Sequence, residues 1–147
     1  MALFHGLDIS ASALTANRLR MDVVSANIAN ANTTRGRFVT GEWIPYQRQM
    51  VVMQPAQSSS FQEVLDRNLQ RLDGVKVTRV VKDPTPFKLL YQPEHPDADE
   101  NGYVRLPNVD LLKETVDMVS ATRSYEANVT AFNASKQMAL KALEIGR

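Results

Sequence analysis

Apolar residues near the end of the chain repeat at intervals of seven. From residue 108 to residue 143 the sequence contains no proline and no glycine. The residues at this spacing are Leu111, Met118, Tyr125, Phe132 and Ala139. So narrow a stripe is typical of a seam between helices, because a helix on a globular core has a wider apolar face. The pattern predicts a long helix over 108–147 that packs against other helices, and it favours a filament or scaffold subunit over an enzyme.

A second heptad pattern occupies the beginning of the chain. The residues that carry it are Leu7, Leu14, Met21 and Ile28. Asp8 or Ser10 is a candidate N-cap of this helix, and the asparagines of segment 26–34 favour caps and turns near its end. We therefore expect a helix within residues 1–34 that pairs with the C-terminal helix as a coiled coil.

The stretch between the two helices, residues 35–107, has a different composition. It contains all seven prolines of the chain, which break long helices and favour short strands joined by turns. Segments rich in β-branched, aromatic or other apolar residues lie at 41–54, 75–81 and 86–92. The simplest arrangement of these strands is a small antiparallel sheet.

One further helix is possible in this middle segment. Ser60 and Glu63 have the spacing of a capping box, so residues 61–72 could form a short amphipathic helix. The predicted fold class is α+β, with two long terminal helices paired as a coiled coil and a small antiparallel β-rich segment between them.

Composition and charge exclude several classes of function. The 17 Lys and Arg residues nearly balance 16 Asp and Glu residues, so no broad cationic surface is available for nucleic acid. The absence of cysteine excludes disulfides and thiolate metal sites. No apolar run approaches the length of about 20 residues that spans a bilayer, so no direct membrane insertion is expected. The first ten residues also lack the features of a secretory signal.

The sequence contains no convincing catalytic, metal or cofactor site. Asp97, Asp99, Asn101 and Gly102 fit the early positions of a calcium loop, but its twelfth position is Asn108, which cannot supply the required bidentate carboxylate. A solvated turn reversed by the pair Asn101-Gly102 is the better interpretation. His5 and His95 have no evident orienting group. We therefore expect no catalytic residue, no metal and no cofactor.

Polar residues interrupt both predicted helices. Asn128 and Asn133 lie in the C-terminal helix, and Asn27 and Asn30 lie in the N-terminal helix, where Leu or Ala would favour an isolated helix more. They are either solvated, or they fix the register of closely packed helices, as a polar residue does in a coiled-coil seam.

Several motifs resemble those of one known family. They are NIANANTT (27–34), YQRQMVVMQ (46–54), GYVRLPNVD (102–110) and the ending from SYEAN to LKALEIGR (124–147). Together they resemble the flagellar basal-body rod proteins, in particular those of the proximal rod. The sequence departs from the family pattern at Ala26, where many relatives have a second asparagine, and over residues 60–73, to which no family role attaches.

The resemblance implies a non-enzymatic subunit that polymerises helically into the hollow drive shaft of the flagellum. It implies export from the cytoplasm through the flagellar type III apparatus without a cleavable signal, and a final location in the periplasmic rod. The implied partners are further copies of the chain, other rod proteins, the rod-base adaptor, the MS ring and the export apparatus. Nucleic acid and a direct membrane anchor are not among them.

The resemblance also implies an assembly interface formed by the terminal helices, within or between subunits. Its candidate residues are Leu7, Leu14, Met21, Asn27, Ile28, Asn30, Asn32, Leu111, Met118, Tyr125, Asn128, Phe132, Asn133 and Ala139. Two alternatives stay open at this point. A hook or distal-rod relative would have a much larger middle region, and a soluble coiled-coil adaptor unrelated to the flagellum would share only the heptads.

Overall fold

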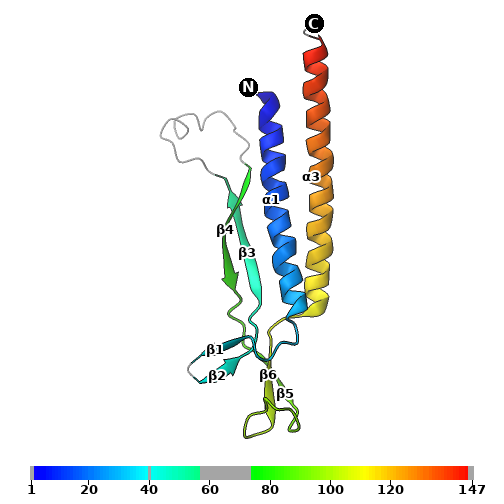
Figure 1. Ribbon diagram of the computed structural model, residues 1–147. Helices are drawn as coiled ribbons and strands as arrows, with labels where there is room; N and C mark the ends of the chain where they lie inside the picture. Colours follow the sequence, from blue (N-terminus) through cyan, green and yellow to red (C-terminus); the bar gives the residue numbers. More distant parts are fainter. Residues whose placement is uncertain (1, 40, 57–73, 146–147) are drawn as a thin grey trace, which may run out of the picture. The chain divides into compact units, whose positions relative to one another are not determined.

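A long helix precedes the β-rich middle segment in the sequence, and a second long helix follows it. The computed structural model describes residues 2–39, 41–56 and 74–145 (Figure 1). Helix α1 covers Ala2–Ala29 and helix α3 covers Leu111–Ile145. The prediction of an α+β chain is therefore confirmed. The predicted short helix over 61–72 lies outside the described residues.

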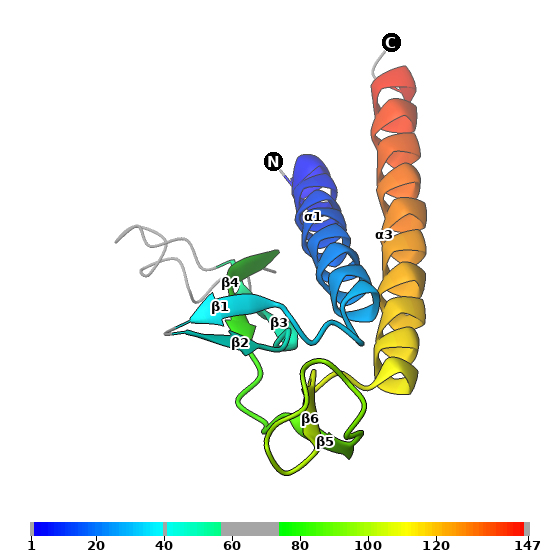
Figure 2. The ribbon, with the colours of Figure 1, turned by 60° about the horizontal axis from the view of Figure 1, so that its bottom comes forward.

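Among the described residues, the strands form three separate two-stranded ladders in place of the single small sheet that we expected. Strands β1 (Arg37–Val39) and β2 (Glu42–Ile44) form the first ladder. Strands β3 (Gln49–Pro55) and β4 (Val75–Lys82) form the second, and β5 (Lys88–Tyr91) and β6 (Tyr103–Leu106) form the third. Figure 2 shows β5 and β6 as a ribbon of their own. Pro45 separates β2 from β3, which is why segment 41–54 cannot continue as one strand.

The helix boundaries follow local capping chemistry. The carboxylate of Asp110 accepts a hydrogen bond from the N–H of Leu112, at 3.1 Å, as an N-cap residue does. The N-terminal helix was expected within residues 1–34, and α1 ends at Ala29. The prediction that Asp8 or Ser10 caps this helix is wrong, because α1 begins at Ala2 and both residues lie inside it.

The chain divides into two compact units, and both units contain part of each helix. The first consists of Met1–Leu19, Val52–Arg79 and Ala121–Arg147. Within it, Ser10, Ala16 and Ala121 are buried. The hydroxyl of Ser12 accepts a hydrogen bond from the N–H of Val75, at 3.0 Å, which attaches the beginning of β4 to α1. Because the side chain of Ser12 is small, the backbone of Val75 can lie close to α1.

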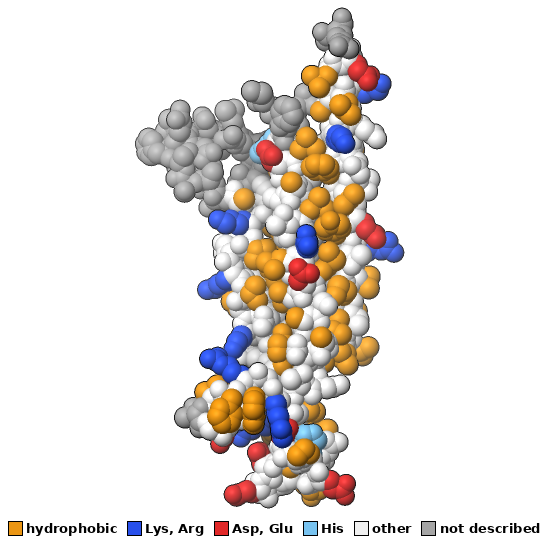
Figure 3. All heavy atoms as spheres, viewed as in Figure 1, with side chains coloured by type: hydrophobic (Ala, Val, Ile, Leu, Met, Phe, Trp, Pro, Cys, Tyr) orange, Lys and Arg blue, Asp and Glu red, His pale blue; other side chains and the backbone are white. Residues whose placement is uncertain are grey.

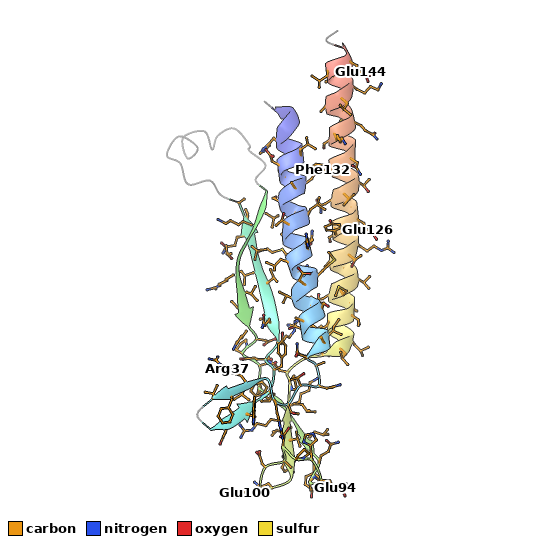
Figure 4. The ribbon with its side chains drawn as sticks, in the orientation of Figure 1. Arg37, Glu94, Glu100, Glu126, Phe132 and Glu144 are labelled. Carbon is orange, nitrogen blue, oxygen red and sulfur yellow. The ribbon has the colours of Figure 1, made fainter. Side chains whose placement is uncertain are left out.

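Gly74 contributes to the same attachment. A Cβ atom added at this position would lie 2.5 Å from the Ser12 hydroxyl. The absence of a side chain therefore lets the backbone before β4 lie directly against α1. Phe132, labelled in Figure 4, lies between α1 and α3 in this unit and is half-buried.

The second unit consists of Arg20–Val51 and Val80–Ser120. Its apolar core contains Val23 and Val24 from α1, Val104 from β6, and Val109 just before α3. Arg20 pairs with Asp117, and Asn27 pairs with Glu114, so α1 and α3 are antiparallel neighbours within this unit. The structure thus supports helix–helix packing, while the coiled-coil geometry stays a prediction.

Candidate assembly site

A buried polar cluster joins both helices to the middle segment inside the second unit. It consists of Asn27 near the end of α1, Arg48 just before β3, and Glu114 in the first turn of α3, and we call these three residues the polar clamp. Only 1% of Asn27 and 0% of Glu114 are exposed. Polar groups this deeply buried are costly unless every one has a partner.

The amide of Asn27 uses its full hydrogen-bonding capacity. Its nitrogen donates to the Gln49 carbonyl oxygen, at 2.8 Å, and to the Glu114 carboxylate, at 2.9 Å. Its oxygen accepts from the Gln49 N–H, at 2.9 Å, and from the Tyr46 hydroxyl, at 3.0 Å. An amide can make two donations and about two acceptances, so Asn27 has nothing left to offer to a partner molecule.

The guanidinium of Arg48 neutralises the buried Glu114. Its Nε lies 2.6 Å from a Glu114 carboxylate oxygen. Its two terminal nitrogens lie 3.3 Å from Asp83 and 3.5 Å from Asp117. A planar guanidinium suits such a site because it directs several donors at once. The clamp therefore holds the start of α3 against β3 and the end of β4.

The pKa values in this cluster reflect the same contacts. Burial alone would lower the pKa of Arg48, but hydrogen bonds and attraction from Glu114 and Asp83 outweigh it and raise that pKa. Hydrogen bonds from the N–H and hydroxyl of Thr85, assisted by Arg48, lower the pKa of Asp83. Burial, followed by the nearby charge of Glu114, raises the pKa of Tyr46. All three residues thus keep their usual charge at neutral pH.

A second polar link ties the segment after α1 to the loop between β5 and β6. Asp97 accepts a hydrogen bond from the Thr34 hydroxyl at 2.8 Å and from Arg35 Nε at 2.7 Å. These bonds lower the pKa of Asp97, and Asp97 in turn raises the pKa of Arg35. Gly102, whose φ is +77°, closes the loop with its N–H donating to the Asp99 carbonyl oxygen. The predicted solvated turn is confirmed.

The outward face of α3 in the second unit is apolar. Leu112, Val116 and Val119 are 79%, 69% and 60% exposed. Their spacing of four and three residues puts them on one side of the helix. A contiguous exposed stripe of this kind is typical of a protein–protein interface. We call these three residues the outer α3 stripe.

Two exposed aromatic pairs extend the apolar surface of the ladders. The rings of Phe38 and Trp43 lie 5.1 Å apart across β1 and β2, and those of Tyr91 and Tyr103 lie 5.3 Å apart across β5 and β6. These side chains are 44–62% exposed. Aromatic side chains are enriched at protein interfaces.

The structure distributes the fourteen predicted assembly residues over three environments. Asn27 is buried in the clamp. The half-buried residues are Leu7, Leu14, Met21, Ile28, Asn30, Met118, Tyr125, Asn128, Phe132 and Ala139. The exposed residues are Asn32, Leu111 and Asn133. The heptad residues are therefore mostly covered within the chain itself, and the contacts predicted for them between subunits stay a prediction.

Sequence reasoning missed Arg48, Glu114 and the outer α3 stripe. Glu114 resembled an ordinary helix-surface charge, although it lies four residues before Met118, on the side of the helix that the heptads turn inward. The stripe could have been found by testing the opposite face of the same helix for a second apolar spacing. Nothing in the sequence alone distinguishes Arg48 from the exposed basic residues.

Two negative findings complete the description. None of the helices in residues 2–39, 41–56 and 74–145 is long and apolar enough to cross a membrane. Within the same ranges, no three His, Cys, Asp or Glu side chains are grouped so that they could hold a metal ion.

Comparison with known proteins defines the class. Residues 7–36 match the family described as flagella basal body rod protein, and residues 100–145 match the C-terminal region of the flagellar basal body rod FlgEFG proteins. These matches define a structural protein of the flagellar rod and not an enzyme.

Full-length relatives narrow the class to one family. The FlgC rod protein of Bacillus subtilis is 55% identical, with 100% of both chains covered. The FlgC protein of Borreliella burgdorferi is 43% identical, with 99% of this chain and 98% of the relative covered. That of Salmonella typhimurium is 40% identical, with 100% of both covered. The chain belongs to the FlgC family of flagellar basal-body rod proteins.

Membership confirms the function predicted from the sequence. The chain is a structural subunit of the flagellar basal-body proximal rod and associates with other rod components. The alternative of a coiled-coil adaptor unrelated to the flagellum is not favoured, since the matches include the middle segment as well as the helices.

Proposed function

We propose that the chain polymerises helically, through its two long helices, into the hollow shaft that transmits torque and conducts exported subunits. The observation that carries this proposal is the outer α3 stripe. Three large aliphatic side chains on one helix face would be left in water by a chain that worked alone. Burial of such side chains stabilises an assembly by about 1.5–3 kcal/mol each when it is complete.

The stripe and the polar clamp have complementary tasks in this proposal. Glu114, on the inward side of α3, fixes the helix to its own chain through Arg48 and Asn27. Val116, on the outward side, is then held at a defined place for a neighbouring subunit. A helix fixed by its own chain transmits force to the next subunit without rotating about its axis. Torque is carried by many such repeated contacts.

The predicted interface is refined accordingly. Leu111, Asn32 and Asn133 are exposed and are proposed to contact neighbours directly. Asn27 is proposed to support the interface from inside, because its side chain has no unfilled hydrogen-bonding position. The half-buried heptad residues are proposed to seal the contact between the two helices, and their outer edges meet neighbouring copies.

The further partners follow from family membership alone. We propose that the chain contacts the rod-base adaptor and the MS ring, and that the flagellar type III apparatus exports it without a cleavable signal. The near balance of charge and the exposed apolar side chains are compatible with a subunit that is buried among other proteins.

Replacement of the stripe tests the proposal. Cells that lack their own copy would be supplied with the unaltered chain or with the double variant Leu112→Ser and Val116→Ser, and basal bodies would be extracted with detergent. The unaltered chain should be present in basal bodies with complete rods, and the variant should give at least tenfold fewer of them. Glu126→Gln, on an exposed part of the same helix, is the matched control. Complete rods at normal number in the double variant would refute a role for the stripe.

A further inference from the structure

The outward face of strand β4 is basic, and its lysines form no ion pair with a described residue. Its Thr78 hydroxyl donates a 3.2 Å hydrogen bond to the Val52 carbonyl oxygen of β3. Exposure alternates along its first half, and the side chains at alternate positions 76, 78, 80 and 82 are all exposed. They are Lys76, Thr78, Val80 and Lys82, and we call them the outer β4 face. Neither β3 nor β4 contains an acidic residue. Figure 3 shows Lys and Arg side chains along this strand.

The loop between β5 and β6 has the opposite character. Residues 92–102 contain Glu94, Asp97, Asp99 and Glu100 and no Lys or Arg. Asp97 forms an ion pair with Arg35, and the Asp99 carboxylate lies 3.9 Å from the Arg105 guanidinium. Glu94 and Glu100 point away from the hairpin in Figure 4 and form no ion pair with a described residue. We call residues 92–102 the acidic tip.

Each of these two surfaces also includes an apolar element. Val80 is 43% exposed between the two lysines of the outer β4 face. The Tyr91–Tyr103 pair lies at the base of the acidic tip, and both rings are exposed. A charged rim around exposed apolar groups is the usual composition of a specific protein interface. The two surfaces therefore both contain exposed apolar groups and have opposite charges.

We infer that the outer β4 face of one copy binds the acidic tip of a second copy of the same chain. The inference rests on the proposed polymerisation and names one contact within it. The two surfaces come from different parts of the chain, so the contact is head-to-tail and can repeat without closing on itself. Lys76 and Lys82 are six positions apart, a separation of about 20 Å along a strand, so a hairpin loop can reach both. Complementary charge also favours the correct register during association.

A simpler explanation exists for the lysines. Charged residues on an exposed strand prevent unwanted pairing of strand edges, and lysine is common in this role. That explanation predicts that reversal of the charges harms solubility alone. It does not predict that reversing the charges of the acidic tip restores the assembly lost when the lysines of the outer β4 face are reversed.

A charge exchange separates the two explanations. Cells that lack their own copy would receive the unaltered chain, the basic-side variant Lys76→Glu with Lys82→Glu, the acidic-side variant Glu94→Lys with Glu100→Lys, or all four changes together. Each two-residue variant should give at least tenfold fewer complete rods. The four-residue variant should recover at least half of the normal number, because the pairing is restored with the signs exchanged. Arg37→Glu and Glu42→Lys, on the exposed β1–β2 hairpin, are matched single-charge controls that should assemble normally.

Two results would overturn the inference. In one, both two-residue variants assemble as well as the unaltered chain. In the other, each variant is folded by circular dichroism but the four-residue variant is no better than either, which would assign these surfaces to a different protein partner. Failure of the proposed function is a separate result, since the unaltered chain would then be missing from purified basal bodies.

Cross-linking gives an independent measurement on the same contact. The natural chain contains no cysteine, so introduced thiols are the only ones in this chain. A chain with both Lys82→Cys and Glu100→Cys should form covalent multimers when assembled basal bodies are treated with a short bismaleimide. Chains with only one of the two substitutions should stay monomeric. Equal multimer formation by the single variants would contradict the head-to-tail contact.

Discussion

Asn27 and Glu114 are 87 positions apart in the sequence, yet the amide of Asn27 donates a 2.9 Å hydrogen bond to the Glu114 carboxylate inside the fold. The bond joins the end of one helix to the beginning of the other. Because the same amide also binds both backbone groups of Gln49, it fixes the two helices and β3 together. The family motifs NIANANTT (27–34) and YQRQMVVMQ (46–54) therefore meet the first turn of α3 at one buried amide.

Substitution of Asn27 by aspartate should be strongly destabilising. The carboxylate loses both donations and places a second negative charge next to Glu114. We expect the free energy of unfolding to fall by about 3–5 kcal/mol, as for other uncompensated buried charges. Urea denaturation of the purified chain measures this change. Asn32→Asp, at an exposed position of the same motif, is the control and should change stability by less than about 0.5 kcal/mol. Similar losses in both variants would contradict the clamp.

Arg48 and Glu114 should be energetically coupled. Arg48→Met leaves a carboxylate buried at 0% exposure without its cation, so we expect a loss of about 3–5 kcal/mol. Glu114→Gln added to that variant removes the buried charge and should restore at least about 1 kcal/mol. A double-mutant cycle measured by chemical denaturation tests this. If the effects of the two substitutions are simply additive, the pair is not coupled.

Acid should weaken the fold through Asp83 and Asp97. The folded state lowers both pKa values below the ordinary value of 3.8. A lowered pKa contributes stability above the ordinary value, and the contribution is lost as pH falls through the folded pKa. The urea midpoint should therefore change little from these groups between pH 7 and pH 5 and should fall below about pH 4.

The variant Asp97→Asn isolates one of the two carboxylates. At pH 7 it should be less stable than the unaltered chain, because Arg35 and Thr34 lose a charged acceptor. The difference should shrink as the pH is lowered below the ordinary carboxyl pKa of 3.8, because the stabilising charge is lost as pH falls through the lowered pKa of folded Asp97. A difference that is constant from pH 7 to pH 3 would show that the charge of Asp97 does not contribute.

Aspartate substitutions of Val116 and Met118 should have different effects on the stability of the chain. Val116 is 69% exposed, so Val116→Asp should leave the melting temperature of the purified chain nearly unchanged and reduce rod assembly at least tenfold. Met118 is half-buried in the heptad stripe, so Met118→Asp should lower the free energy of unfolding by about 2–4 kcal/mol. Thermal denaturation and counts of complete rods on the same two variants decide the matter. Equal destabilisation by both would mean that the outer α3 stripe is covered within the chain.

Heptad periodicity predicted the two long helices, and segments rich in β-branched, aromatic or other apolar residues predicted most of the strands. The heptads of both ends and the β-branched segment 75–81 correspond to α1, α3 and β4. Three-residue strands such as Arg37–Val39 leave too short a pattern to detect. The single sheet was wrongly expected because pairing partners depend on contacts between distant segments, which composition does not encode.

The candidate site was less accessible to prediction. Asn27 was placed at a subunit contact because the family resemblance implies an assembly interface there, while helix propensity left open whether the residue is solvated or fixes the helix register. Its four hydrogen bonds depend on Tyr46, Gln49 and Glu114, which the sequence does not bring together until the chain is folded. The outer α3 stripe was missed because the stronger heptad on the opposite face already accounted for the helix.

The short hairpins of the described residues also bear on the order in which the subunit folds. β1 with β2 and β5 with β6 connect residues near one another in sequence, and hairpins of this kind form in about 1–10 μs. The slower event is the meeting of Asn27 and Glu114, which closes a loop of 87 positions. Each chain would thus form these two hairpins almost at once and complete its fold only when the two helices meet.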